Sequence, residues 1–478
     1  MQDEDALREV AKDCVHCGFC LPVCPTYQLW AEEMDSPRGR IYLVNEILDG
    51  AEVSASAAEH FDRCLGCMAC MTACPSGVQY DQLIEAARVW TEEARSGSGV
   101  QPELASRTSG TGDDGQVAEV RGAAPGPGSG DGPGVPDLPP APKRPARDRV
   151  ARAAIFALFP YPKRLKAVTA PLRLAQRTGL DRRLAHSRLP GRVSPTLGAA
   201  MRLAPPVAPA AAGRPLPRHV PAIGTRRAVV GMLTGCVQSV FFPQVNAATA
   251  RVLAAEGCDV VIPREQGCCG ALSSHSGRED EAIAFAQRTI ATFEQAGVEA
   301  IVVNSAGCGS AMKEYERLLS GAEGYWAERA AELSGKVRDL AEFLAELGPV
   351  APRHPLPVTA AYHDACHLAH AQGITRQPRE LLRGIPDLEL VELADAGTCC
   401  GSAGVYNLLQ PEAAGELGAR KAESVLATRA PLLISANPGC SLQIASALAD
   451  RGEHIAVAHT VQVLDASIRG HRPASLLG

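Results

Sequence analysis

The arrangement of the cysteines constrains this chain more than any other feature. The sequence has 17 cysteines in 478 residues, with eight in the first 74 residues and nine from Cys236 onward. In a secreted chain this number would indicate disulfides. The first residues are acidic and lack the apolar stretch of a signal peptide. We therefore expect a cytoplasmic chain whose cysteines bind metal or carry out redox chemistry.

The eight N-terminal cysteines form the same run twice. Each run reads Cys-x2-Cys-x2-Cys-x3-Cys-Pro, beginning at Cys14 and at Cys64. This spacing binds [4Fe–4S] clusters in two-cluster ferredoxins, where the fourth cysteine of each run ligates the other cluster. Structural zinc sites usually use paired Cys-x2-Cys units and fit poorly. We therefore expect one cluster on Cys14, Cys17, Cys20 and Cys74, and a second on Cys64, Cys67, Cys70 and Cys24.

The chain up to residue 224 divides into three segments. Residues 1–95 are predicted to form a helical ferredoxin domain, because Ile41–Leu48 and Tyr80–Ala94 have helical patterns. Residues 96–146 contain 11 Gly and 9 Pro, so they cannot bury enough apolar surface to offset chain entropy. We expect a disordered linker there. Residues 147–224 are predicted to be a basic, partly helical connector.

The charge of this connector is unusual for the chain. Residues 143–227 hold 19 Lys and Arg against two acids, a net charge of +17, whereas the rest of the chain carries -23. Ala154–Leu184 has an amphipathic helical pattern, which we expect Pro160, Pro162 and Pro171 to break into short pieces. A solvated coil, partner docking and peripheral contact with an anionic membrane surface are all compatible with such a segment.

From residue 225 onward the pattern is that of an α/β protein built twice. Predicted strands at Ala228–Leu233, Asp259–Pro263 and Ala300–Asn304 alternate with helical segments at Gln244–Glu256 and Arg278–Ala296, which indicates a parallel sheet. Three cysteine positions then recur at offsets of 130 to 132 residues. We infer duplicated domains over residues 225–350 and 351–478. The recurring residues are Cys236, Cys268, Cys269 and Cys308, followed by Cys366, Cys399, Cys400 and Cys440.

Each repeat contains a pair of adjacent cysteines followed by glycine. Adjacent cysteines make a strained disulfide but can supply two thiolates to one polynuclear centre. Three of the loci follow predicted strands, where helix N-termini favour thiolate over thiol. Further iron–sulfur clusters in these domains are therefore expected. Cys258 lacks a counterpart and is predicted to be a buried thiol, and a structural role is favoured for His363 and His367 over proton delivery.

At these motifs the chain resembles the iron–sulfur subunit of bacterial glycolate oxidase, over about residues 1–95 and 225–478. The wider group includes heterodisulfide reductase, anaerobic glycerol-3-phosphate dehydrogenase C and lactate-utilisation subunits. The resemblance implies an α/β plus all-α architecture, with a two-cluster ferredoxin domain followed by duplicated Cys-Cys-Gly domains. The motifs that carry it are Thr234–Gln238, Gln266–Leu272, Tyr362–His370, Thr398–Gly404 and Asn437–Cys440.

The same resemblance implies a function. Electrons would pass from a FAD-binding partner subunit, which oxidises glycolate to glyoxylate, to a quinone-type acceptor at the inner face of the cell membrane. This chain would contribute no catalytic residue to the hydride chemistry. The predicted strand Ala228–Leu233 is not followed by the G-x-G-x-x-G motif of dinucleotide-binding proteins.

One departure leaves alternatives open. Heterodisulfide reductase repeats end in Cys-x-x-Cys, whereas Cys308 is followed by Gly-Ser-Ala and Cys440 by Ser-Leu-Gln. Four cysteines per repeat therefore remain, and cluster type and occupancy stay open. A subunit of a D-lactate or glycerol-3-phosphate dehydrogenase, a heterodisulfide reductase-like catalytic subunit and an assembly scaffold are the other functions considered. A net charge of -6 and 4% aromatic residues give no reason to expect nucleic-acid binding.

Overall fold

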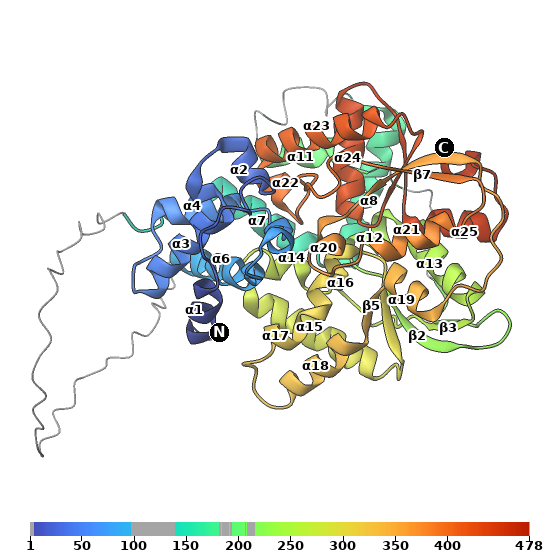
Figure 1. The fold of residues 1–478 in the computed structure, drawn as a ribbon, viewed down its shortest axis with the longest axis horizontal. Helices are drawn as coiled ribbons and strands as arrows, with labels where there is room; N and C mark the ends of the chain where they lie inside the picture. Colours follow the sequence, from blue (N-terminus) through green and yellow to red (C-terminus); the bar gives the residue numbers. More distant parts are fainter. Residues whose placement is uncertain are drawn as a thin grey trace, which may run out of the picture.

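The computed structural model describes residues 4–96, 139–180, 194–205 and 216–477, together with Arg183, Gly191 and Val207. Most of the linker predicted over residues 96–146 lies outside these residues. Within them, no helix is long and apolar enough to cross a bilayer. Figure 1 shows the N-terminal helices gathered at one end of the molecule and the two α/β units at the other.

The N-terminal domain is helical, as predicted. Its helices are α1 (Glu4–Lys12), α2 (Pro25–Trp30), α3 (Pro37–Leu48), α4 (Ala55–Arg63), α5 (Ala69–Ala73) and α6 (Tyr80–Ser96). Apolar residues of α1, α3, α4 and α6 share one core that includes Leu7, Ile41, Phe61 and Leu83. The hydroxyls of Ser36 and Ser54 accept hydrogen bonds from backbone N–H groups at the first turns of α3 and α4 and fix where these helices begin.

A buried ionic network ties the two cysteine runs together. The Asp35 carboxylate accepts hydrogen bonds from Arg40 Nη2 at 3.2 Å and Arg63 Nη1 at 3.0 Å, and His60 Nδ1 lies 2.9 Å away. Arg40, only 1% exposed, also donates to the backbone carbonyls of Asp35 and His60. Because Asp35 precedes α3 and His60 and Arg63 lie on α4, these contacts fix the segment after the first run against the helix before the second.

The end of the predicted linker is more ordered than its composition predicts. Ala55 N–H donates to the Pro139 carbonyl and Ala141 N–H to the Val53 carbonyl, so the end of the predicted linker is held against the N-terminal domain. Arg144, a buried residue, forms ion pairs with Asp62 and Glu92. The coil predicted over residues 96–146 therefore does not extend to its last residues.

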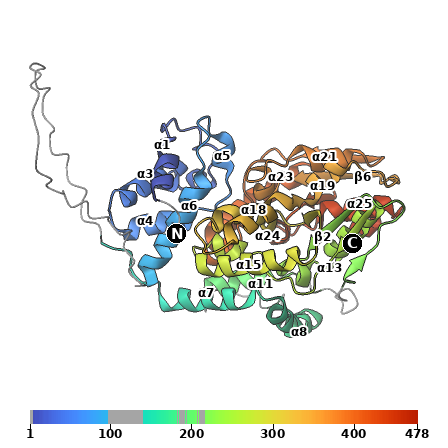
Figure 2. The same cartoon turned by 90° about the horizontal axis from the view of Figure 1, so that it is seen from below.

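The described residues of the connector include the helices α7 (Ala146–Leu158), α8 (Pro162–Thr178) and α11 (Pro195–Arg202). Figure 2 shows α7 running from beside α6 towards the α/β units, with α8 along their outer side. Helix α8 continues through Pro171, so the prediction that this proline ends a helix is wrong. Leu165 and Thr169 are buried in the preceding turns, and this packing holds the helix together across the hydrogen bond that proline removes.

The two α/β units have matching sheets. The first has the order β1-β3-β2-β4-β5 and the second β7-β6-β8-β9, and all pairs except the antiparallel β1–β3 edge are parallel. Central strands β2 (Ala228–Leu233) and β6 (Val358–His363) lie 130 residues apart, which confirms the duplication. The other strands are β1 (His219–Val220), β3 (Cys258–Val261), β4 (Ala300–Val303), β5 (Val337–Asp339), β7 (Leu388–Glu392), β8 (Leu432–Ser435) and β9 (Ala456–Ala458).

The two units share one hydrophobic cluster, and each also has a further cluster built mainly from its own residues. Val230 and Val260 of the first sheet and Ala360 and Ile434 of the second belong to the same buried cluster. Helices α13 (Pro243–Ala255) and α25 (Thr460–Ile468) pack together across the units. Cys258 is fully buried in this core, and its burial raises the pKa of its thiol to about 11. It is thus a buried thiol, as predicted.

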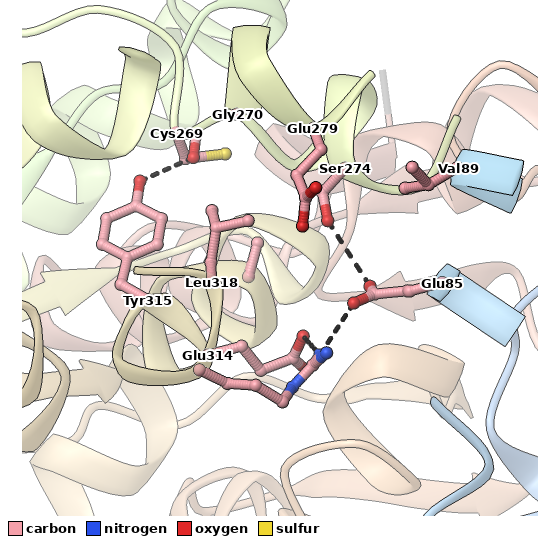
Figure 3. Close-up of a pocket in the computed structure, with 11 residues that line it drawn as sticks. Glu85, Val89, Cys269, Gly270, Ser274, Glu279, Glu314, Tyr315 and Leu318 are labelled. Carbon is pink, nitrogen blue, oxygen red and sulfur yellow. Dashed lines mark hydrogen bonds and ion pairs between the residues drawn. The ribbon is translucent and has the colours of Figure 1, made fainter. Parts of the chain in front are cut away.

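Helix α6 joins the N-terminal domain to the first α/β unit through Glu85. Its carboxylate lies 2.7 Å from Arg317 Nη2 and 3.3 Å from His275 Nδ1. Figure 3 shows the same carboxylate with its hydrogen bond from Ser274 of the first α/β unit. Burial alone would raise the pKa of Glu85, but His275 and Arg317 hold it at about 2. The carboxylate is therefore ionised and couples two domains that are distant in the sequence.

The substitution Glu85→Ala should lower the free energy of unfolding by about 3 kcal/mol, because it leaves Arg317 short of its nearest buried counter-charge. The folded pKa lies below the usual 4.5, so this contribution is complete above pH 4.5 and is lost only as the pH falls towards 2. The loss, measured by urea unfolding of the anaerobic holoprotein, should be the same at pH 7 and pH 8. Glu9→Ala, which removes an exposed pair with Lys12, should cost less than about 1 kcal/mol. Equal effects of the two substitutions would contradict this role of Glu85.

Candidate iron–sulfur sites

The first candidate site lies at the surface of the N-terminal domain. Its cavity is lined by the first three cysteines of one run and the fourth of the other, so the structure brings together Cys14, Cys17, Cys20 and Cys74. Cys70 lies on its wall, and Cys17 is exposed. Burial raises the pKa of Cys14 and Cys20. Four thiols converging on one cavity are a donor set that fits a [4Fe–4S] cluster.

The two cysteine loops have the same backbone shape. His16 and Gly66, at corresponding positions, have φ of 53° and 63°, and Gly18 and Met68 have φ of 86° and 60°. His16 and Met68 thus adopt the left-handed conformation despite their side chains, which costs energy. Gly66 N–H points at Cys64 Sγ at 3.4 Å. The loops are held in a shape that directs backbone N–H groups towards sulfur.

The second candidate site is buried. It is formed by Cys24, Cys64, Cys67 and Cys70, again with the fourth cysteine of one run beside the first three of the other. Burial raises the pKa of Cys67 and Cys70 well above the usual value for a thiol. Burial would do the same at Cys64, but the guanidinium of Arg40, followed by that of Arg88, holds the pKa of this thiol below its usual range.

Sequence reasoning missed Arg40 and Arg88 as residues of this site. Arg88 Nη2 donates to the Cys64 carbonyl at 2.8 Å, and its guanidinium lies 3.1 Å from where a Cβ on Gly66 would be. Two guanidinium groups beside a buried, negatively charged centre offset its desolvation cost and favour its reduced state. Nothing in the local pattern marks them, because arginines on helices usually face solvent.

The third candidate site is the Cys-Cys-Gly centre of the first α/β unit. Cys236 follows β2 at the start of α12 (Val237–Phe241), and Cys308 lies in α16 (Ala306–Lys313), which follows β4. Cys236 Sγ lies 3.7 Å from Cys268 Sγ, and the Cys269 thiol contacts those of Cys268 and Cys308. The contact with Cys236 and burial raise the pKa of Cys268 well above its usual value, against the contact with Cys269, which lowers it.

The glycine of this motif allows close packing. Gly270 has φ of 87°, and a Cβ there would lie 3.2 Å from the Ala282 carbonyl of α15 (Glu279–Glu294). Gly270 N–H also donates to Cys268 Sγ at 3.4 Å. The motif therefore requires glycine both for its backbone conformation and for the approach of the helix behind it.

The fourth candidate site repeats this arrangement in the second unit. Cys366 begins α20 (Cys366–Ala369) after β6, and Cys440 lies in α24 (Pro438–Asp450) after β8. The pKa of Cys366 is held well below the usual range. The largest cause is the contact with Cys399, followed by the imidazole of His367, whose Nδ1 lies 3.5 Å from Cys366 Sγ. The pKa of Cys400 is also held well below the usual range, first by Cys399 and then by Cys440 and His363.

The histidines contribute more to this site than the sequence predicts. His363 is buried, and one ring nitrogen lies within 4.8 Å of the sulfurs of Cys400 and Cys440. In the described parts of the chain, neither of its ring nitrogens has a hydrogen-bond partner. The structural role favoured over proton delivery stays a prediction for both histidines, and at His363 the neighbours that define it are sulfurs.

The second and fourth sites touch each other. Cys67 of the N-terminal domain and Cys366 and Cys399 of the second α/β unit belong to one buried cluster, together with Tyr406. After burial, the nearby Cys366 is the next cause that raises the pKa of Cys67. Thr72 Oγ1 also lies 2.9 Å from His370 Nδ1 across this contact. The two thiol sets therefore meet within one buried cluster.

The cross-over of the fourth cysteines can be tested with a reciprocal pair of variants. Cys24→Ser should abolish or alter the EPR signal of the buried site and leave that of the surface site, and Cys74→Ser should do the reverse. The reason is that each substitution removes one of four ligands from the other run's cluster. Signals of reduced, anaerobically purified protein decide this. Loss of the surface-site signal in Cys24→Ser would show that each run holds its own cluster.

Comparison with known families agrees with this division. A 4Fe-4S dicluster domain model matches residues 10–78, and a cysteine-rich domain model matches residues 230–313 and 360–445. A model described as the linker region of the glycolate oxidase iron-sulfur subunit matches residues 147–204. The likeness therefore includes the basic connector, which lies outside the ranges predicted from the cysteine motifs.

Relatives align over nearly the whole chain. The probable glycolate oxidase iron-sulfur subunit of Bacillus subtilis is 34% identical over 440 residues, which is 90% of this chain and 88% of the relative. The glycolate oxidase iron-sulfur subunit of Escherichia coli is 32% identical over 466 residues, or 96% and 94%. Lactate utilization protein A of Exiguobacterium is 32% identical over 241 residues, covering 50% of this chain and 98% of that protein. With a dicluster domain, duplicated cysteine-rich domains and these full-length matches, the chain belongs to the family of glycolate oxidase iron-sulfur subunits.

Proposed function

We propose that this iron–sulfur electron-transfer subunit carries electrons from a FAD-binding partner subunit, which oxidises glycolate to glyoxylate, to a quinone-type acceptor. The names of the two full-length relatives support glycolate as the substrate of the complex. Bound iron–sulfur clusters pass single electrons and so divide the electron pair that a flavin takes from a hydroxy acid. This chain contributes ligands and electrostatic surroundings to that transfer and no residue to hydride removal.

The cofactor ligands are part of this proposal. We assign the surface site of the N-terminal domain to one [4Fe–4S] cluster and the buried site to the other, and each Cys-Cys-Gly site to a further iron–sulfur centre. The support is the convergence of four thiols at each place. These ligands are Cys14, Cys17, Cys20 and Cys74; Cys24, Cys64, Cys67 and Cys70; Cys236, Cys268, Cys269 and Cys308; and Cys366, Cys399, Cys400 and Cys440.

The contact between the buried N-terminal site and the second Cys-Cys-Gly site carries the proposal. Cys70 of the buried set lines the same cavity as the exposed Cys17, and Cys67 of that set shares a buried cluster with Cys366. Val15 and Phe19, which are 68% and 64% exposed, flank Cys17 with apolar side chains. Such a surface suits a partner that exchanges electrons at short range, because desolvating it costs little.

Reconstitution tests the proposed reaction. The isolated chain should not reduce a dye with glycolate, and addition of the flavin subunit should restore activity. A second candidate substrate is a hydroxy acid of the lactate type, which the relative named lactate utilization protein A favours. Comparing glycolate with D-lactate in the reconstituted complex separates the two. Glycolate-dependent dye reduction by this chain without flavin would contradict the electron-transfer role.

We further propose that the complex lies on the cytoplasmic face of the membrane, within reach of a quinone. Helix α8 buries Leu165 against the α/β unit and exposes Lys163, Lys166 and Arg177 together with Val168 and Leu174. Basic and apolar side chains on one exposed helix favour attachment to anionic lipid. Each basic residue near such a surface contributes about 1 kcal/mol.

A charge-matched pair of variants tests this attachment. Replacing Lys163, Lys166 and Arg177 by Gln should reduce binding of the complex to anionic vesicles at least tenfold, and salt should weaken wild-type binding. The control replaces Arg218, Arg226 and Arg376 by Gln, which removes the same charge from exposed positions of the α/β units. Co-sedimentation measures both. Equal binding of the two variants would show that α8 does not contact lipid.

A further inference from the structure

His363 is a buried side chain without a hydrogen-bonded structural role. It is the last residue of β6 and is 1% exposed. Neither ring nitrogen has a hydrogen-bond partner in the part of the chain that the structure describes. A polar group buried in this way costs about 1–3 kcal/mol. Such a cost is usual at functional sites, where a ligand satisfies the group.

The residues around His363 indicate that a metal ion would satisfy its ring nitrogen. One of its nitrogens, Cys400 Sγ and Cys440 Sγ all lie within 4.8 Å of one another. Ligands bound to one metal at about 2.1 Å for nitrogen and 2.3 Å for sulfur lie about 3.6 Å apart in tetrahedral geometry. Small side-chain rotations therefore suffice to place all three on one metal ion. Neutral imidazole is a common metal ligand.

The first repeat lacks this donor. The position equivalent to His363 is Leu233, the last residue of β2, which is 2% exposed and packs in an apolar core. The first centre thus has four thiols and no imidazole, whereas the second has four thiols and an imidazole. The neighbouring His367 differs from His363, because its Nδ1 lies 3.5 Å from Cys366 Sγ and its ring stands against that of His275.

We propose that His363 is a nitrogen ligand of the iron–sulfur centre in the second Cys-Cys-Gly domain, which makes the two repeats chemically different. The proposal rests on the proposed function in one respect, that this repeat binds an iron–sulfur centre. Where histidine replaces cysteine on iron, the reduction potential rises, because imidazole is neutral and thiolate is negative. In the second centre His363 would therefore be a neutral ligand where a fifth thiolate would add negative charge, and this centre is the one that touches the buried ferredoxin site.

Isotope labelling of the full-length holoprotein tests this without a variant. Protein grown with 14N-histidine and with 15N-histidine is reduced anaerobically and compared by pulsed EPR. A strong nitrogen coupling that changes with the isotope is the expected result, and its absence would overturn the proposal. Counting iron separates a failure of the His363 assignment from a failure of the proposed function. Two [4Fe–4S] clusters account for about eight iron atoms per chain, so a content no higher than this would overturn the proposal that the repeats bind iron–sulfur centres.

Variants then assign the nitrogen. His363→Cys should keep the iron, lose the coupling and lower the potential of the centre, and His363→Leu, which copies the first repeat, should also lose the coupling. His367→Gln is the matched control, because it removes a half-buried histidine on the other side of Cys366, and it should retain the coupling. Coupling that persists in both His363 variants, or that disappears in His367→Gln, would assign the nitrogen elsewhere and overturn the proposal.

Discussion

The cost of placing many thiolates together inside a protein governs this structure. Burial favours the neutral thiol, and at Cys67 and Cys70 the neighbouring sulfurs raise the pKa further. Positive groups offset this cost: the backbone N–H groups of Gly66 and Gly270 point at sulfur, and two guanidinium groups lie beside Cys64. Bound iron completes this compensation, because metal ligation deprotonates thiols outright.

The elements that hold these compensating groups also hold the domains together. Arg40 pairs with Asp35, and Asp35 binds α4, so one buried network both offsets charge at Cys64 and sets the geometry of the two cysteine runs. Arg88 lies on the same helix as Glu85, which fastens the N-terminal domain to the first α/β unit. A substitution at either place would therefore affect both electrostatics and assembly.

Much of the architecture follows from spacing and periodicity. The strand predicted at Ala228–Leu233 has the bounds of β2, and the recurring cysteine offsets predict the matching sheets, because both features depend on local sequence. The contact of Cys67 with Cys366 depends on how two domains pack, which no local pattern encodes. The unpaired state of His363 likewise depends on the strands and helices around it, and Pro171 stays helical because of tertiary packing.

The central claim is that the buried ferredoxin cluster and the second Cys-Cys-Gly centre form one continuous path for electrons. The most direct test is the magnetic interaction between them in the fully reduced, anaerobic holoprotein. We predict that the EPR signal of the cluster at Cys24, Cys64, Cys67 and Cys70 is split or broadened, and that Cys366→Ser removes the effect while Cys236→Ser does not. An unsplit signal that neither substitution changes would contradict the account.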